Sequence, residues 1–283
     1  MDVEASSVLR SCAHYVAERA HEHRIDTTIR GCWEIRYALG LIDVGFTIPR
    51  DFVVLQTIGF GSCHFEGIGA TADVGATIGR SALDLHEYPL AYQIAGLDAV
   101  ASAFDEPCSS VVTLQGSNRE KVIQRSKLLC DVTVRALQLA DRPARIRRVT
   151  MIGVLSTVVG LLSRDPRLDV RAIDKSPHVI GRNYHGVTVV DDRQTAEIVA
   201  TSDVILVTGM SITEGDLDVI LDVANRAGTV VIMYMQSGAN LGAPILSRGA
   251  HIVISEEYPF YFMGPGSSVI KIRTRAGEYC YAI

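Results

Sequence analysis

The sequence lacks paired cysteines and long apolar runs. Its six cysteines include no Cys-x-x-Cys pair and no zinc-type spacing, so we expect free thiols in a reducing compartment. No uninterrupted apolar stretch approaches the ~20 residues that a membrane span requires. The acidic N-terminus, residues 1–4, is not typical of a signal peptide. These absences predict a cytoplasmic protein with no membrane partner.

An excess of basic residues is also absent. Lys and Arg number 27 against 32 Asp and Glu, which gives a formal net charge of -5. Nucleic-acid binding usually needs a broad basic face, and the strongest basic run, residues 142–148, is better explained as a solvated segment between domains. We therefore expect a small-molecule substrate as partner and no nucleic acid.

The segment Phe260–Gly266 is too apolar for a free loop. It could cover a cleft or pack on a second subunit. The second explanation predicts a homo-oligomer.

What is present is the composition of a compact globular protein. The chain has 283 residues and is 48% hydrophobic, so it can bury a substantial core in one large domain or two ordinary ones. A change of pattern near Pro143 predicts a small α+β N-terminal domain at 1–142 and a Rossmann-like domain at 143–283.

The first half mixes helical and strand patterns. We expect an amphipathic helix at 3–23, an antiparallel meander at 26–31, 33–41 and 52–58, and a connector at 107–116. Helical character is expected to begin at Ser81, with an apolar stripe from Leu90 to Phe104, and a further helix is expected at 118–139. Six glycines lie between Gly59 and Gly79, which predicts a loop that moves or lets another backbone or a ligand approach closely.

Beyond Arg148 short apolar strands alternate with helices. This pattern predicts a doubly wound parallel sheet covered on both faces. Strands are expected at 149–154, 170–174, 187–190, 204–208, 230–234 and 251–255, with helices at 157–163, 194–200, 215–227 and 244–247. A closing antiparallel hairpin is expected from 268–273 and 278–283.

In such a sheet ligands bind at the carboxyl ends of the strands, where the strand order reverses. Two predicted loops reach this point, after the first and the fourth strand. The candidate cofactor-binding residues are Gly153, Leu155, Ser156, Asp174, Thr208, Gly209, Met210 and Ser211. Ordinary helix capping by Ser156 or Thr157 and a tight turn at Gly209 explain parts of this set equally well.

The first loop lacks the Gly-x-Gly-x-x-Gly pattern, since it holds only Gly153 and Gly160. Asp174 nevertheless follows Gly153 by 21 residues, where an acidic side chain accepts hydrogen bonds from a ribose. A terminal Asp can also cap the next turn. The combination favours an adenosine-type cofactor without pyrophosphate, such as S-adenosylmethionine.

Residues 63–66 place a thiol, an imidazole and a carboxylate close together in the sequence. His64 and Glu66 are candidate catalytic groups for proton transfer, and with Cys63 they could ligate a metal ion. Neighbours in sequence need not converge in space, so no metal ligand set is assigned.

Two groups of motifs resemble a known family. They are Gly79–Leu85 with Ile94–Val100 in the first half, and Val149–Gly153, Asp203–Gly209 and Glu214–Leu217 in the second. The chain resembles the family described as "putative heavy-metal chelation", a group of unknown function. The resemblance implies an enolase-N-terminal-like first domain, a Rossmann-like second domain and a link to metal chelates.

Together these observations predict a small-molecule metabolic enzyme, a transferase or cyclase, that binds S-adenosylmethionine and a polar metabolite in a cleft between the domains. The alternative is a non-enzymatic protein that binds a heavy metal or a metal chelate.

Overall fold

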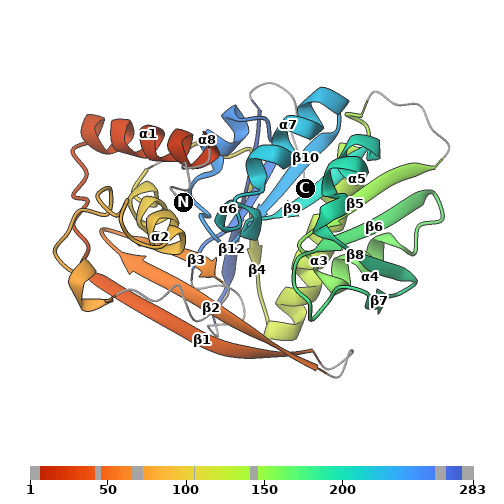
Figure 1. Ribbon diagram of the computed structural model, residues 1–283, viewed down its shortest axis with the longest axis horizontal. Helices are drawn as coiled ribbons and strands as arrows, with labels where there is room; N and C mark the ends of the chain where they lie inside the picture. Colours follow the sequence, from red (N-terminus) through yellow and green to blue (C-terminus); the bar gives the residue numbers. More distant parts are fainter. Residues whose placement is uncertain are drawn as a thin grey trace.

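The computed structural model describes residues 7–41, 46–65, 73–104, 106–140, 146–258 and 266–275. Within these ranges the strands form a three-stranded and a nine-stranded sheet. The small sheet lies to one side of the large one, with helices between them and over both faces of the large sheet (Figure 1). Among the described residues no helix has the length and apolarity needed to cross a bilayer.

The small sheet is the predicted antiparallel meander, with a different third strand. It contains β1 (Gly31–Leu41), β2 (Phe46–Gln56) and β3 (Phe60–Phe65). The strand expected at 26–31 is wrong, and β3 lies in the segment expected to be a loop. The helix α2 (Leu90–Ala101) packs on this sheet, and a Cβ on Gly61 would lie 2.1 Å from the Ala99 nitrogen. Gly61 therefore allows a helix to pack on a strand.

The large sheet has the Rossmann strand order, and the predicted α/β doubly wound fold is confirmed. Its parallel strands run in the spatial order β8-β6-β5-β9-β10-β11. Their bounds are β5 (Arg147–Ile152), β6 (Leu168–Asp174), β8 (Val187–Asp191), β9 (Val204–Thr208), β10 (Val230–Met235) and β11 (Ile252–Glu256). At one edge of the sheet, the short strand β7 (Asn183–Tyr184) pairs antiparallel with β8.

Helices cover both faces of this sheet. On one face lie α3 (Asn118–Ala136) and α4 (Ser156–Leu162), and on the other α5 (Thr195–Thr201), α7 (Leu217–Ala227) and α8 (Gly242–Ser247). The N-terminal helix α1 (Ser7–Glu22) packs against α2, α7 and α8 (Figure 1). Because α1 and α2 share a hydrophobic core with α7 and α8, the small sheet is joined to the large sheet by apolar packing.

Two antiparallel strands extend the large sheet. They are β12 (Ser268–Thr274), which pairs with β11, and β4 (Ser110–Leu114), which pairs with β12. The connector expected at 107–116 is wrong because it contains β4. The first strand of the expected closing hairpin is confirmed, whereas 278–283 lie outside the described residues.

The boundary expected between residues 142 and 143 does not coincide with a division between layers. Both β4 and α3 precede it: β4 is a strand of the large sheet and α3 packs on that sheet, and Leu114 and Leu129 are fully buried with other strand residues. The domain boundary stays a prediction.

Candidate functional site

A small pocket lies at the carboxyl ends of β5, β6 and β9, where the strand order reverses. It brings together five of the eight candidate cofactor-binding residues, from both predicted loops. These are Gly153, Asp174, Thr208, Met210 and Ser211. Its volume is about 30 Å³, which is room for about two water molecules.

Gly153 shapes the turn between β5 and α4. Its φ of 77° lies in the left-handed region, and a Cβ there would lie 2.0 Å from the Thr208 hydroxyl oxygen. Its N–H donates to the Ile173 carbonyl oxygen at 2.9 Å. Both the backbone conformation and the contact with β9 therefore require glycine.

Asp174 ends β6 and fixes the two neighbouring turns. Its two carboxylate oxygens accept hydrogen bonds from the Val154 and Ser176 N–H groups, each at 2.8 Å. Each oxygen can accept a second hydrogen bond, and the side chain is only half-buried. Asp174 thus has a structural role and retains capacity for a ligand hydroxyl.

The loop after β9 continues as α6 (Met210–Thr213). The Ser211 hydroxyl donates to the Thr208 carbonyl oxygen at 2.9 Å, which closes the turn. Gly209 does not line the pocket. A Cβ there would lie 2.9 Å from the Ser237 carbonyl oxygen, so Gly209 instead lets this loop pack against the segment after β10.

Leu155 and Ser156 also lie away from the pocket lining. They begin α4, which packs on the α3 face of the sheet, and α4 has no side-chain cap at Leu155. The capping role considered for Ser156 is therefore wrong. Whether any of the eight residues contacts a cofactor stays a prediction.

Four charged residues that the sequence reasoning missed dominate the pocket lining: Lys175, Asp192, Glu214 and Asp216. The Lys175 ammonium contacts the Asp216 carboxylate directly and lies 3.7 Å from Glu214 and 3.9 Å from Asp192. Partial burial lowers the pKa of Lys175, but the hydrogen bond and charge of Asp216, with the other two carboxylates, outweigh it and raise that pKa.

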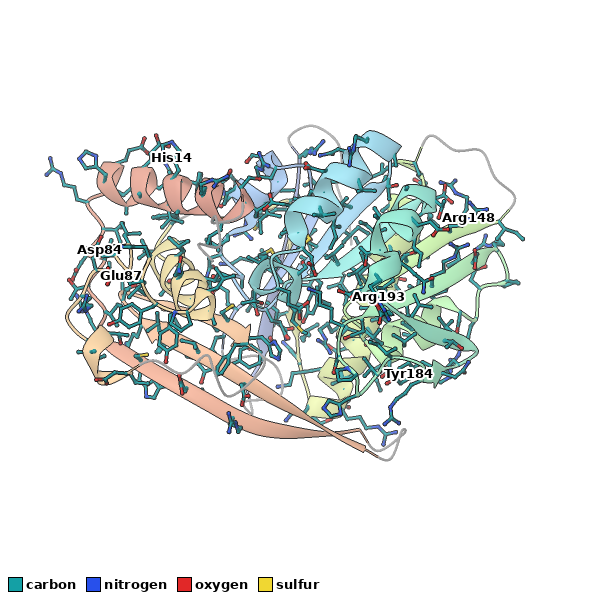
Figure 2. The ribbon with its side chains drawn as sticks, viewed as in Figure 1. His14, Asp84, Glu87, Arg148, Tyr184 and Arg193 are labelled. Atoms are coloured by element: carbon teal, nitrogen blue, oxygen red, sulfur yellow. The ribbon has the colours of Figure 1, made fainter. Side chains whose placement is uncertain are left out.

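With Asp174, the lining holds four carboxylates and one lysine, an excess of negative charge. Three of these side chains come from the ends of β6, β8 and α6, which only the fold brings together. Arg193, labelled in Figure 2, marks the short helix η3 (Asp192–Gln194) that carries one of them, and it pairs outside the pocket with Asp191.

Cys63 and His64 do not form a ligand pair. They are consecutive residues of β3, so their side chains point to opposite faces of the small sheet. Burial raises the pKa of the Cys63 thiol, which disfavours the thiolate that binds metals. His64 is buried, does not line the pocket, and stacks edge-on to Phe52 at 5.4 Å. Glu66 lies outside the described residues.

Metal ligation finds no support elsewhere in the ranges that the structure describes. There, no three side chains of His, Cys, Asp or Glu form a group suited to a metal ion.

The comparisons with known proteins agree with this architecture. The family model described as "Putative heavy-metal chelation", DUF364, matches residues 136–233, which contain the pocket strands β5, β6 and β9. No curated protein matches the chain.

Two solved structures of this family are similar to the chain. One, a protein with unknown function from Pyrococcus horikoshii, has a TM-score of 0.55 and 15% identity, over 93% of this chain and 99% of that one. The other, from Desulfitobacterium hafniense DCB-2, has a TM-score of 0.51 and 11% identity, over 78% and 87%. The resemblance seen in the sequence is confirmed: residues 136–233 match the DUF364 family, and the chain has the fold of its solved members.

Proposed function

We propose that the pocket at the carboxyl ends of β5, β6 and β9 binds an adenosine-type cofactor, with S-adenosylmethionine favoured, in an enzyme that acts as a transferase or cyclase. The observation that carries the proposal is the convergence of the Gly153 turn, Asp174 and the Thr208–Ser211 loop on one pocket. This is the position at which doubly wound folds bind nucleotides. Asp174 would receive the ribose hydroxyls on its remaining acceptor sites.

The charge of the pocket decides between classes of adenosine ligand. Four carboxylates against one lysine repel the doubly negative pyrophosphate of a dinucleotide. S-adenosylmethionine instead carries a positive sulfonium and a positive ammonium group against a single carboxylate, so its net charge is positive. The excess of carboxylates therefore favours it over NAD.

Ligand entry requires a local rearrangement. Pockets that hold drug-sized ligands are usually ~300 Å³ or larger, whereas this one encloses about 30 Å³. The contact between Lys175 and Asp216 spans the lining and must open. A cationic ligand would replace the Lys175 ammonium among the three carboxylates, which offsets the lost ion pair.

Calorimetric titration with S-adenosylmethionine and NAD tests the proposal. We expect S-adenosylmethionine to bind the native chain and to bind Lys175→Met about five to ten times more tightly, because that variant removes the competing cation, and such ion pairs contribute on the order of 1 kcal/mol. Arg193→Met is the matched control, since it removes a neighbouring cation outside the pocket lining.

Absence of binding by any adenosyl compound, to the native chain and to Lys175→Met alike, would remove the proposal. Tighter binding of NAD than of S-adenosylmethionine would overturn the choice of ligand. The alternative function, metal or metal-chelate binding, has the family description in its favour but no group of ligands among the described side chains.

A further inference from the structure

The two edges of the small sheet differ in how they are covered. At the β3 edge the segment after β10 lies against the strand, and its Gly238 N–H donates to the Ser62 carbonyl oxygen at 3.0 Å. The Ser237 hydroxyl oxygen accepts the His64 N–H there at 2.9 Å. At the other edge lies β1, and no strand of the described residues pairs with its outer side. In Figure 1, β1 runs along the lower margin of the molecule.

The β1 edge lacks most of the features that keep sheet edges from pairing. Such edges are usually short, interrupted by a bulge, or protected by proline or lysine, because their N–H and C=O groups otherwise bind another strand. In contrast, β1 has 11 residues and pairs with β2 in one unbroken register along its whole length. Its sequence contains neither proline nor lysine. This edge is therefore suited to pairing with a further strand.

Exposed aromatic side chains lie on the face of the small sheet that α2 does not cover. Trp33 of β1 is 44% exposed and Phe60 of β3 is 40% exposed, with ring centroids 6.2 Å apart. Successive residues of a strand point to opposite faces, and the neighbouring Cys32 is buried in the core that contains α2. Trp33 therefore lies on the face opposite α2. Exposed aromatic surface of this kind is typical of a contact with another protein chain.

Two opposite charges lie in the middle of the β1 edge, on the α2 side of the strand. They are Glu34, which is half-buried, and Arg36, which is exposed. One carboxylate oxygen of Glu34 accepts the Tyr92 hydroxyl of α2. Arg36 donates to Asp51 through Nε and one Nη. The second oxygen of Glu34 and the other guanidinium N–H groups keep capacity for further partners.

The order of these two charges selects a second copy of β1 as partner and fixes the register. When a strand pairs antiparallel with its own copy about a two-fold axis, the residue before the axis lies opposite the residue after it. An axis at Ile35 places Glu34 opposite Arg36 of the second copy, and does so twice. An axis at Glu34 or at Arg36 would place like charges opposite each other. Opposite charges stabilise a strand pair at such positions and like charges destabilise it.

We propose that the chain forms a dimer in which β1 pairs antiparallel with β1 of a second copy, about a two-fold axis at Ile35. This pairing aligns residues 31–39 of the two copies and joins their small sheets into one. The contact is closed, since each copy covers the open edge of the other. It does not involve the segment 260–266, of which 260–265 lie outside the described residues, and it does not depend on the ligand of the pocket.

The test combines charge reversal with measurement of mass by light scattering during size-exclusion chromatography. We expect the native protein to have twice the mass of one chain. Glu34→Arg and Arg36→Glu should each weaken the dimer at least tenfold, because each places like charges opposite each other at two positions. An equimolar mixture of the two variants should form heterodimers, since two cations of one then face two carboxylates of the other. Arg10→Glu, a reversal at an exposed position of α1, should leave the dimer unchanged.

Ile35→Cys is the second variant, in case the reversals prevent folding. Directly opposite residues of antiparallel strands have Cα atoms about 4.5–5.5 Å apart, a distance that a disulfide bridges. Oxidised glutathione should therefore link this variant into covalent dimers, whereas the native chain, with its own cysteines, is the control and should not be linked. A native protein with the mass of one chain would overturn the proposal. So would a dimer that neither reversal weakens, a mixture of the reversed variants that does not associate, or an Ile35→Cys variant that forms no covalent dimer.

Discussion

Gly153 is subject to two separate constraints, one from its own backbone and one from its neighbour on β9. Its φ of 77° is unfavourable for any side chain, and the space where a Cβ would lie is filled by Thr208. Gly215 has the same φ of 77°, but no atom lies within 4 Å of the place that a Cβ would occupy there. Substitutions at Gly153 and Gly215 therefore distinguish the cost of backbone strain from the cost of steric overlap with a neighbouring side chain.

We expect Gly153→Ala to lower the free energy of unfolding by about 3 kcal/mol, with roughly 1 kcal/mol from backbone strain and the rest from overpacking against Thr208. Gly215→Ala should cost only about 1 kcal/mol, because strain alone acts there. Urea unfolding of the three proteins measures both values. Equal losses in the two variants would show that contact with Thr208 relaxes without cost.

Single residues of the site differ in how far the sequence reveals them. Asp174 could be predicted because its distance from Gly153 along the chain is set by one β-α-β unit. Lys175, Asp192, Glu214 and Asp216 could not, because each looks like a solvated charge in its own segment. They form one charged group because the fold brings their loops together, and the sequence does not show these distances.

At the scale of elements, Asp98 of α2 connects three segments. One carboxylate oxygen accepts the Ser62 N–H of β3 at 2.8 Å, and the other accepts the Asn240 N–H at 2.7 Å, in the loop after β10. Asp98 thus links the small sheet to the large one through hydrogen bonds. Burial raises its pKa to about 7, against the hydrogen bonds from Asn240 and Ser62, and the charge of Glu257 adds to the rise.

This shift predicts a pH dependence of stability. The pKa of Asp98 is raised from 3.8 to about 7 on folding, so the folded state binds the proton more tightly. The associated stability is complete below about pH 4 and is lost as pH rises through 7. In Asp98→Asn this dependence should be absent. The difference in unfolding free energy between the two proteins should change by on the order of 4 kcal/mol between pH 4 and 8.

Urea unfolding of the native chain and of Asp98→Asn at several pH values tests this expectation. An amide nitrogen cannot accept a hydrogen bond, so the Asp98→Asn variant also loses one contact to Ser62 or Asn240 at every pH. Only the change of the difference with pH reports on the titration. A difference that stays constant from pH 4 to 8 would contradict the assigned shift.

The elements of the second half could be predicted because their strands are short, continuously apolar and separated by helices. The two strands that were missed, β3 and β4, do not show the alternating or continuously apolar pattern that predicts a strand. In β3, Gly61 is required by the close approach of α2, so the segment resembles a loop in sequence. In β4, Val111 is exposed at the sheet edge and the strand has only five residues, so no clear alternation appears.

On the scale of the whole molecule, one hydrophobic core crosses the boundary that the sequence suggested. This core contains residues of α1, α2 and the small sheet together with residues of α7 and α8. A second core lies between the other face of the large sheet and α3 with α4. The second core needs α3 and β4, which come before residue 142.

Two fragments of the chain therefore differ in a predictable way. Residues 106–283 retain α3 and β4, whereas residues 143–283 lose the side chains that these elements contribute to the second core, among them Leu114 and Leu129. Both fragments lose the same contacts with α1 and α2, so the comparison isolates the second core. We expect 106–283 to show a cooperative thermal transition by circular dichroism and 143–283 to show none, because several buried apolar side chains would each lose about 1.5–3 kcal/mol of burial energy. Equal transitions in both fragments would place the boundary of the folding unit at residue 143, and α3 and β4 would then be accessory to the Rossmann-like sheet.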